Sequence, residues 1–418
     1  MTGNVLLAIG LVLTTASQLR LPAVPLGPGE VFILLWLGYA SFRLVALDSI
    51  ANPGALFTIG AFWFCFALAL SIGTCIVVLR QQLDASSMSH DTFAYLLVLV
   101  MSCLIVATMR PATDIRRTAW LVVGIWDVAL IIQIAIGWNV IDFPEVQPWY
   151  WDRFRGWSEN PNQIALFCAI LTPLSLHLAL SHKGIAPRIF GLLSCIFSFV
   201  GGRLTKSDAF LLSTLAATIF FLALRIRTWL TSDEYRTGFR FGAAVLIVVA
   251  AIPLAASLSP YALATADEAE GFALSLAKDG GGEGTKQTAA VRASLWEAAL
   301  KTGLSSASLG LGPGPHLEKP NTLHSEFLPT PFEAHSTLLD VFTQGGLLGV
   351  LAVCCLFAGV LIVLLRAKLD ALGAGMAALL LFSFGHFVLR HPIVWFVLAA
   401  SLVVGSATAK APSFRNGG

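Results

Sequence analysis

The chain has 418 residues, of which 56% are hydrophobic and only 12% are charged, with a formal net charge of +2. A soluble domain carries about 25% charged residues, so this composition excludes an ordinary water-soluble protein. The near-neutral charge also gives no indication of a nucleic-acid partner. The apolar runs are continuous rather than alternating, which argues against a membrane barrel. We therefore expect an all-α polytopic membrane protein, whose helices pair all their backbone groups internally.

Apolar segments follow one another along most of the chain. About 20 apolar residues span a bilayer as a helix. On this basis we predict about twelve transmembrane helices, at residues 4–19, 29–47, 53–79, 92–109, 118–138, 163–181, 188–200, 208–224, 241–258, 336–365, 371–389 and 392–407. One long polar stretch interrupts the series. The predicted organisation is therefore an N-terminal membrane part (1–258), a large partly helical loop (259–334) and a C-terminal membrane part (335–418).

The distribution of basic residues predicts the orientation. With the N-terminus inside, most basic residues of the short loops fall on the inside, as the positive-inside rule expects. These are Arg110, Arg116, Arg117, Lys183, Arg188, Arg225, Arg227, Arg236, Arg240, Arg366, Lys368, Lys410 and Arg415. Long loops are exempt from the rule, so the loop 259–334 is expected outside, which would be the periplasm if the cell is Gram-negative.

Five basic residues of the predicted outside loops stand out, namely Arg153, Arg155, Arg203, Lys206 and Arg292. Basic residues at helix ends commonly contact lipid headgroups, and this is one interpretation of each of them taken alone. The other is an anion clamp, because guanidinium groups pair bidentately with phosphate. Several such groups from different loops would hold a pyrophosphate.

The large loop has its own predicted order. Residues 288–301 are rich in helix formers, with Thr288 as a predicted cap and Glu297–Lys301 as an i,i+4 pair. This places Arg292 on a short amphipathic helix over the bundle. The glycine-rich residues 279–285 are expected to be a connector, since the spacing and Lys-Ser/Thr ending of a phosphate-binding P-loop are absent. Residues 311–315 (LGPGP) predict a rigid turn, which is either a plain connecting loop or a turn whose glycines let the backbone approach a ligand.

His335 opens the run HSTLLDVFTQGGLLG, where the large loop re-enters the membrane. A histidine titrates near neutral pH and suits acid–base chemistry at this interface. The alternative is an interfacial histidine that caps a helix containing packing glycines. Three ionisable groups inside predicted spans, Arg43, Asp127 and His386, are functional candidates by position, and Arg43 and Asp127 are expected to pair across two helices.

Four groups of residues occur in a characteristic order. Arg155–Gly156 and Asn160–Pro161–Asn162 precede an apolar helix, and Arg203 and Ser207 lie in a short outside turn. Arg292 and Trp296, followed by residues 311–314, lie ahead of His335–Ser336, and nine residues later comes Gly346-Leu-Leu-Gly349. This ordered set, together with the twelve-span topology, resembles the O-antigen ligase and O-antigen (exopolysaccharide) polymerase superfamily of membrane glycosyltransferases. One departure is that Arg203 and Ser207 are separated where family members often show Ser-Arg together, which leaves open whether Arg203 or Lys206 contacts phosphate.

The resemblance implies glycosyl transfer on the outer face of the bacterial inner membrane. The donor would be a glycan on undecaprenyl pyrophosphate, attacked at its anomeric carbon by an acceptor hydroxyl with inversion. Arg292 and Arg203 would stabilise the charge of the departing pyrophosphate. His335 would be a general base or a hydrogen-bonding residue, with Glu333 and Asp208 as alternative bases. Weaker candidates for substrate binding are Arg153, Arg155, Lys206, Asn160 and Asn162, although Asn160 would also serve as a helix cap.

No cofactor is expected, and the absence of a DxD carboxylate pair from the outside segments agrees with a metal-free site. The implied partners are the lipid-linked glycan, a glycan or lipid acceptor and the membrane lipids, with room for a partner that sets chain length or exports the product. Ligation to lipopolysaccharide and polymerisation of a polysaccharide share the donor chemistry, so both stay open. The rival hypothesis is a secondary transporter or flippase of lipid-linked saccharides, which predicts inverted repeats and broken polar helices at mid-bilayer.

Overall fold

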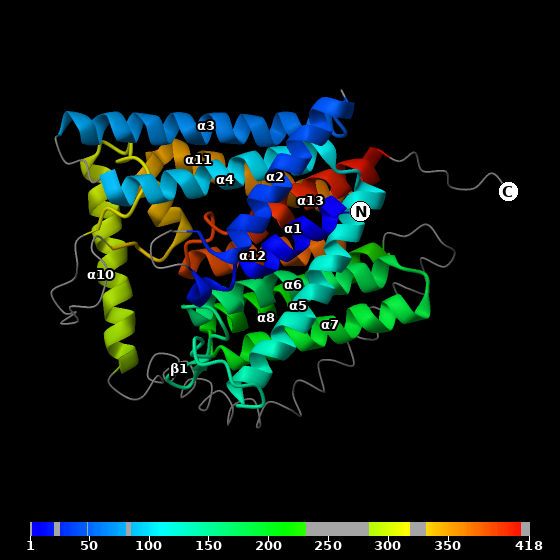
Figure 1. Cartoon of the computed structure of the whole chain (residues 1–418). Coiled ribbons are helices and arrows are strands. Elements are labelled where there is room, and N and C mark those ends of the chain that lie inside the picture. The colour runs from blue at the N-terminus through cyan, green and yellow to red at the C-terminus, as the bar shows by residue number, and fades with distance from the viewer. Residues whose placement is uncertain are drawn as a thin grey trace.

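The computed structural model describes residues 2–20, 26–47, 49–80, 85–230, 284–317 and 332–410, and these form a helical bundle (Figure 1). The helices are α1 (Thr2–Leu13), α2 (Pro28–Leu47), α3 (Pro53–Leu79), α4 (Ala85–Thr108), α5 (Arg116–Gly137), α6 (Pro161–Ser181), α7 (Ile185–Leu204), α8 (Asp208–Leu230), α10 (Gly284–Ser305), α11 (Thr337–Arg366), α12 (Asp370–Gly385) and α13 (Pro392–Lys410). Short elements join them, the 3-10 helix η1 (Ser17–Leu19), the π-helix η2 (Pro111–Ile115) and an antiparallel hairpin of β1 (Trp149–Tyr150) and β2 (Arg153–Phe154).

The predicted all-α polytopic membrane protein is confirmed. Within the described residues, nine helical segments are long and apolar enough to cross a membrane, and α1 and α12 are shorter apolar helices. Eleven predicted spans coincide with helices, whereas the predicted span 241–258 lies outside the described residues. The expected helix of the large loop is α10, which starts at Gly284, so Thr288 is not its cap. The domain boundaries stay a prediction.

Two predicted spans are too long. The span 4–19 is wrong beyond Leu13, because the hydroxyls of Thr14 and Thr15 donate back to the carbonyls of Leu11 and Val12. Such side-chain bonds compete with continuation of a helix. The span 371–389 is wrong beyond Gly385, where the chain turns into an irregular segment before α13.

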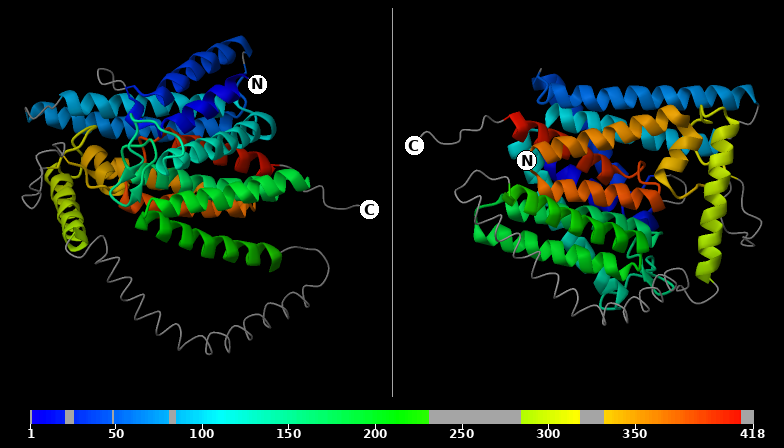
Figure 2. Two further views of the ribbon diagram at one scale, coloured as in Figure 1. Left: turned by 60° about the horizontal axis from the view of Figure 1, so that its bottom comes forward. Right: turned by 180° about the vertical axis from the view of Figure 1, so that it is seen from behind.

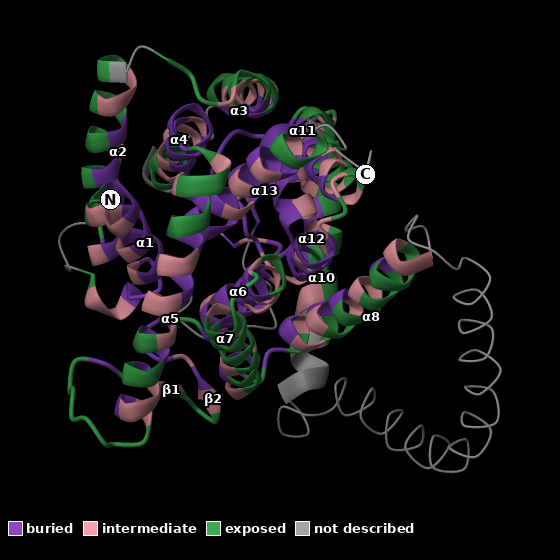
Figure 3. Cartoon of the chain, turned by 90° about the vertical axis from the view of Figure 1, so that its right-hand side faces the viewer, coloured by how far each residue is buried: buried purple, intermediate pink, exposed green. Residues whose placement is uncertain are grey.

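Most helices run roughly along one direction, and α10 crosses one end of the bundle almost at right angles to them (Figures 1 and 2). Seen along the bundle, α3 and α4 lie on one side, α6, α7 and α8 on the other, and α12 and α13 between them (Figure 3). Helix α6 packs on α7, α8 on α12, and α3 on α11. The short connection between α7 and α8 and the hairpin β1–β2 both lie toward the end that α10 crosses (Figure 1).

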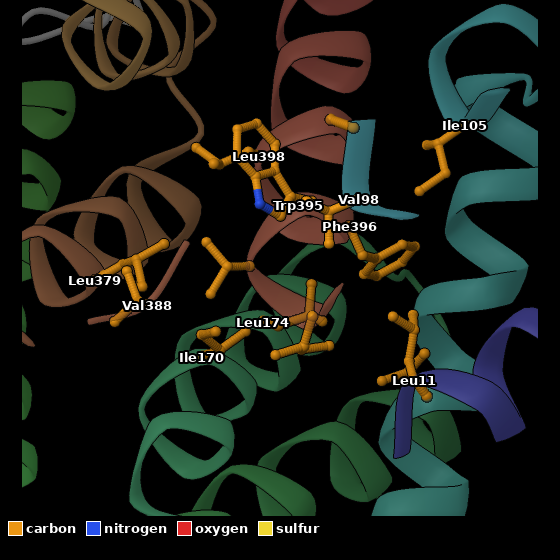
Figure 4. Packing of buried hydrophobic residues seen from close by; sticks show 14 of the residues in the cluster. Leu11, Val98, Ile105, Ile170, Leu174, Leu379, Val388, Trp395, Phe396 and Leu398 are labelled. Carbon is orange, nitrogen blue, oxygen red and sulfur yellow. The ribbon is translucent and has the colours of Figure 1, made fainter. Parts of the chain in front are cut away.

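The centre of the bundle is tightly packed and aromatic. Trp395 and Phe396 on α13 are fully buried and meet Ile170 and Leu174 of α6 in one apolar cluster (Figure 4). Large apolar residues on the outer helices are instead exposed, such as Val45 at 82% and Leu79 at 84%. Since lipid tails are themselves apolar, such exposure is expected of helices that face a bilayer.

Candidate active site at the end crossed by α10

Helix α10 is held over the start of α11 by a small apolar cluster. Leu295 and Ala299 are buried there against Leu317, Phe332 and Ala334. The indole N–H of Trp296 donates to the carbonyl of Ala334 at 3.2 Å. The Glu297–Lys301 pair, at 2.6 Å, lies on the exposed face of α10 as predicted. The amphipathic α10 thus fixes the segment that leads to His335.

Helix α11 is broken at Gly346, whose φ of 59° and ψ of −158° are not helical. The carbonyls of Thr343 and Gln344, which the break releases, accept hydrogen bonds from the N–H groups of Leu311 and Gly312, each at 2.8 Å. Buried carbonyls in a membrane protein need such partners. The loop 306–314 therefore completes the broken helix.

The glycines at this junction allow backbones to touch. A Cβ on Gly312 would lie 2.6 Å from Oγ1 of Thr74, and one on Gly73 of α3 would lie 2.2 Å from the Gly312 nitrogen. The predicted turn at 311–315 therefore brings Gly312 against α3 and α11. The spaced glycines after His335 likewise serve the geometry of α11.

His335 precedes α11 with a left-handed backbone conformation, φ 53°. Strained non-glycine residues of this kind cluster at functional sites. Asp340, on the first turns of α11, is buried, and its carboxylate accepts the N–H groups of Ala334 at 2.6 Å and Ser336 at 3.1 Å. These two bonds fix the backbone on both sides of His335, whose own side chain is exposed.

Thr337 ties the turn after α12 to the same place. Its hydroxyl donates to the carbonyl of His386 at 2.7 Å and accepts the N–H of Val388 at 3.1 Å. This explains why α12 ends where it does. It also places His386 beside the site, since the charges of His335 and Arg292 act on it. His386, predicted inside a span, therefore belongs to the end of the bundle.

A buried ion-pair network lies next to the segment that carries His335. Arg390, in the turn between α12 and α13, pairs with Glu333 and, at 2.7 Å, with Asp91 on α4. The side chain of Asp91 is fully buried and also accepts from Gln344 at 3.4 Å. Burial disfavours the charge of Arg390, but Glu333 and Asp91 raise its pKa overall. The network joins four segments of the chain around His335.

Three arginines from separate segments converge near Asp208, at the start of α8. The charges of Arg153 on β2, Arg203 at the end of α7 and Arg292 on α10 all act on the Asp208 carboxylate. The guanidinium groups of Arg203 and Arg292 make no hydrogen bond or ion pair with the described residues. Three cations facing one carboxylate leave a net positive site, suited to an anion.

Of the three arginines, Arg153 is the one that hydrogen bonds hold in place. Its Nε donates to the carbonyl of Thr205 at 3.0 Å, and its second amino group to Oδ1 of Asn162 at 3.0 Å. The side chain thereby joins the α5–α6 loop to the α7–α8 turn. Burial lowers the pKa of Arg153 and the like charge of Arg292 lowers it further, against the attraction of Asp208.

The other predicted binding residues have partners of their own. Arg155 donates to Gln147 and to the carbonyl of Glu159, with Tyr150 under its guanidinium. Asn160 accepts the N–H of Asn162 at 2.9 Å as the cap of α6, as expected. These residues shape the loop that carries Arg153.

Lys206, the alternative to Arg203, pairs with Asp152 at 2.6 Å on the exposed rim. The hydrogen bond from Lys206 is the main cause that lowers the pKa of the Asp152 carboxyl. Arg203 is exposed and has no such partner among the described residues. Of the two cations, Arg203 is therefore the one whose charge is available to an anion.

Although the His335 side chain reaches the surface, the protein around it removes part of its solvation, and this is the main cause that lowers its pKa. The charges of Arg292 and Arg390 lower this pKa further, while Glu333 raises it. An imidazole of this kind is neutral near pH 7 and can accept a proton. Across the described ranges, no three His, Cys, Asp or Glu side chains are grouped so as to hold a metal ion.

Sequence reasoning missed Arg390, Asp91 and Asp340. Arg390 was detectable, since it lies in the last predicted outside loop with no other arginine or lysine beside it. The predicted Arg43–Asp127 pair is wrong. Arg43 pairs with Asp114 at 3.4 Å, and Asp127 accepts from Ser194 at 2.5 Å, because α2 and α5 do not place those two charges together.

Residues 193–354 match the family model described as O-antigen ligase. This part of the chain is therefore similar to O-antigen ligases. The predicted resemblance is thereby confirmed. No curated protein matches the chain.

The matched region begins within α7 and ends within α11. It therefore includes Arg203, Arg292 and His335 and also the break at Gly346. Arg153 and Arg390 lie outside it and reach the same site from the α5–α6 loop and the α12–α13 turn. The site is thus built by the matched region together with flanking parts of a multi-pass membrane protein.

Proposed function

We propose that the chain is a glycosyltransferase of the bacterial inner membrane, with its site facing the periplasm. It moves a glycan from undecaprenyl pyrophosphate to an acceptor hydroxyl, as a ligase or as a polymerase. The observation that carries the proposal is the placement of Arg153, Arg203 and Arg292 around Asp208 at one end of the bundle, with Arg292 also close to His335. The match of residues 193–354 to the O-antigen ligase model supports the same class of reaction.

In the proposed reaction, the acceptor oxygen forms a bond to the anomeric carbon while the bond from that carbon to the pyrophosphate oxygen breaks. The electron pair leaves with the pyrophosphate, and direct displacement inverts the anomeric centre. Arg203 and Arg292, which have no partners among the described residues, stabilise the charge that develops on the leaving group. Arg153 places the two loops that frame them.

His335 accepts the proton of the acceptor hydroxyl in this proposal. Its lowered pKa keeps the imidazole neutral at pH 7, and Asp340 holds the backbone on both sides of it. General-base catalysis of this kind contributes about 10²–10⁴-fold to a rate. Each cation that stabilises the leaving group contributes about 10²–10³-fold.

The test is glycan transfer in proteoliposomes from a purified polyprenyl-pyrophosphate glycan, measured as release of the lipid pyrophosphate. Arg292→Gln and His335→Ala should each lose at least about a hundredfold in turnover. Lys301→Gln is the matched control, because Lys301 lies on the exposed face of the same helix and should keep full activity.

Wild-type activity in both site variants would show that these residues are not the catalytic groups. A wild-type protein that moves the donor across the bilayer without releasing lipid pyrophosphate would instead support the transporter hypothesis.

A further inference from the structure

A cavity of about 440 Å³ lies at the end of the bundle opposite to His335. Its walls come from η2, the start of α5, the end of α6, the start of α12 and the second half of α13. Figure 3 views the molecule from this end, with α5, α6, α12 and α13 side by side. Neither the predicted motifs nor the proposed reaction uses this cavity.

The inner wall of the cavity is apolar and elongated. It includes Leu174, Leu178, Phe396, Val397, Ala400 and Val404. Along α13 the lining extends from Phe396 to Thr408, and a helix rise of about 1.5 Å per residue makes this wall about 18 Å long. A hollow of this shape accommodates an extended alkyl chain better than a compact solute.

The mouth of the cavity is polar and basic. Arg116, His177 and His182 contribute to it, and no Asp or Glu is among its described lining residues. The guanidinium of Arg116 makes no hydrogen bond or ion pair with the described residues. The carbonyl of His182 accepts from Nε of Arg188 at 2.6 Å, which brings a second arginine to the same end. Two arginines with an apolar trough behind them complement an anionic amphiphile.

We propose that this cavity binds an anionic phospholipid from the leaflet opposite to the candidate active site. Its phosphate lies beside Arg116, and one acyl chain lies along α13 from Val404 toward Phe396. Basic pockets between membrane helices recognise acidic headgroups by charge. An acyl chain gains little by leaving surrounding lipid, which is equally apolar, so selectivity comes from the headgroup.

Trp120 lines the cavity and provides the readout. The protein is reconstituted in phosphatidylcholine vesicles in which either phosphatidylglycerol or phosphatidylcholine carries brominated chains. The quenching that belongs to Trp120 is obtained by subtracting the fluorescence quenching of the Trp120→Phe variant from that of the wild type. We expect brominated phosphatidylglycerol to quench at about one fifth of the concentration that brominated phosphatidylcholine needs, since one basic residue contributes about 1 kcal/mol to such binding.

Arg116→Gln should remove this fivefold preference. Arg117→Gln is the matched control, with the same substitution on the next residue of α5, which does not line the cavity, and it should keep the preference. Ala400→Leu, which fills the apolar wall, should reduce quenching by both lipids.

Equal quenching by the two lipids in wild type would overturn the proposal, as would an unchanged preference in Arg116→Gln. Displacement of phosphatidylglycerol by a polyprenyl phosphate at much lower concentration would also overturn it, by assigning the cavity to a polyprenyl lipid.

Discussion

Arg390→Gln is the perturbation that tests the architecture of the site most directly. Asp91 is fully buried, Glu333 is 17% exposed, and Arg390, at 23% exposed, is ion-paired with both. The substitution removes the arginine that both carboxylates share, which leaves Glu333 without a cation and Asp91 with only His90, 3.1 Å away. Breaking a buried pair costs about 3–5 kcal/mol, and the residual exposure of Arg390 and Glu333 places the expected loss near 3 kcal/mol.

The loss should depend on the charge that is left behind. Asp91→Asn in the Arg390→Gln background removes the buried carboxylate that has lost its arginine, so the double variant should be more stable than Arg390→Gln alone. The coupling between the two positions should be about 0.5–3 kcal/mol. Arg390→Lys, which keeps the charge, should lose less than Arg390→Gln.

The assay is reversible unfolding in detergent, with the free energy of unfolding compared at pH 7.5. Arg366→Gln is the control, because it makes the same change at an exposed arginine at the other end of α11. An unchanged free energy in Arg390→Gln would refute the reasoning. So would a double variant less stable than the single one, because relief of the unpaired charge would then be absent.

Three further predictions follow from the same geometry. Gly346→Ala should destabilise the protein by several kcal/mol, since the φ of 59° and ψ of −158° at Gly346 suit only glycine and the added Cβ would lie 2.2 Å from the Ser308 carbonyl oxygen. The control is Gly359→Ala, where a Cβ meets no atom within 4 Å. An unfolding midpoint equal to that of the control would contradict the prediction. Arg153→Lys should lower turnover about tenfold because lysine lacks the fork that holds Thr205 and Asn162, and equal turnover would show that the fork is dispensable. The free energy of unfolding should fall as pH decreases from about 6.5. The reason is that the folded state lowers the pKa of several histidines and so binds their protons less tightly than the unfolded state does. A free energy of unfolding that is flat from pH 7 to 5 would contradict this. The histidines outside the spans with lowered pKa are His316 and His335, together with His391 (about 4) and His386 (about 3).

The class of fold was predictable because its cause is local. A run of apolar residues must form a helix in lipid, whatever surrounds it, since its backbone groups find no other partners there. The spans at α3 and α11 could therefore be placed within a residue or two of their observed ends. The pattern of α10 was visible for the same reason, with its apolar face and its Glu297–Lys301 pair.

Parts of the candidate site were also predictable. Arg203 and His335 could be selected because each lies where a predicted outside loop meets a predicted span, and Arg292 because it is a basic residue on a predicted helix of the large outside loop. What could not be predicted is the partner of each charge. Arg155 and Lys206 resemble Arg153 in sequence, yet both have partners on the rim, while Arg153 reaches the site.

The sequence by itself thus determined the membrane class, most helix positions and the residues from which the site is drawn, because hydropathy and helix formation act over a few turns of chain. Tertiary structure decided which of those residues meet. Arg390 and Asp91, 299 positions apart, pair only because α4 packs against α13. The break in α11 is complete only when the loop 306–314 supplies its hydrogen bonds. Such contacts depend on which helices pack against one another, and local sequence patterns do not specify this.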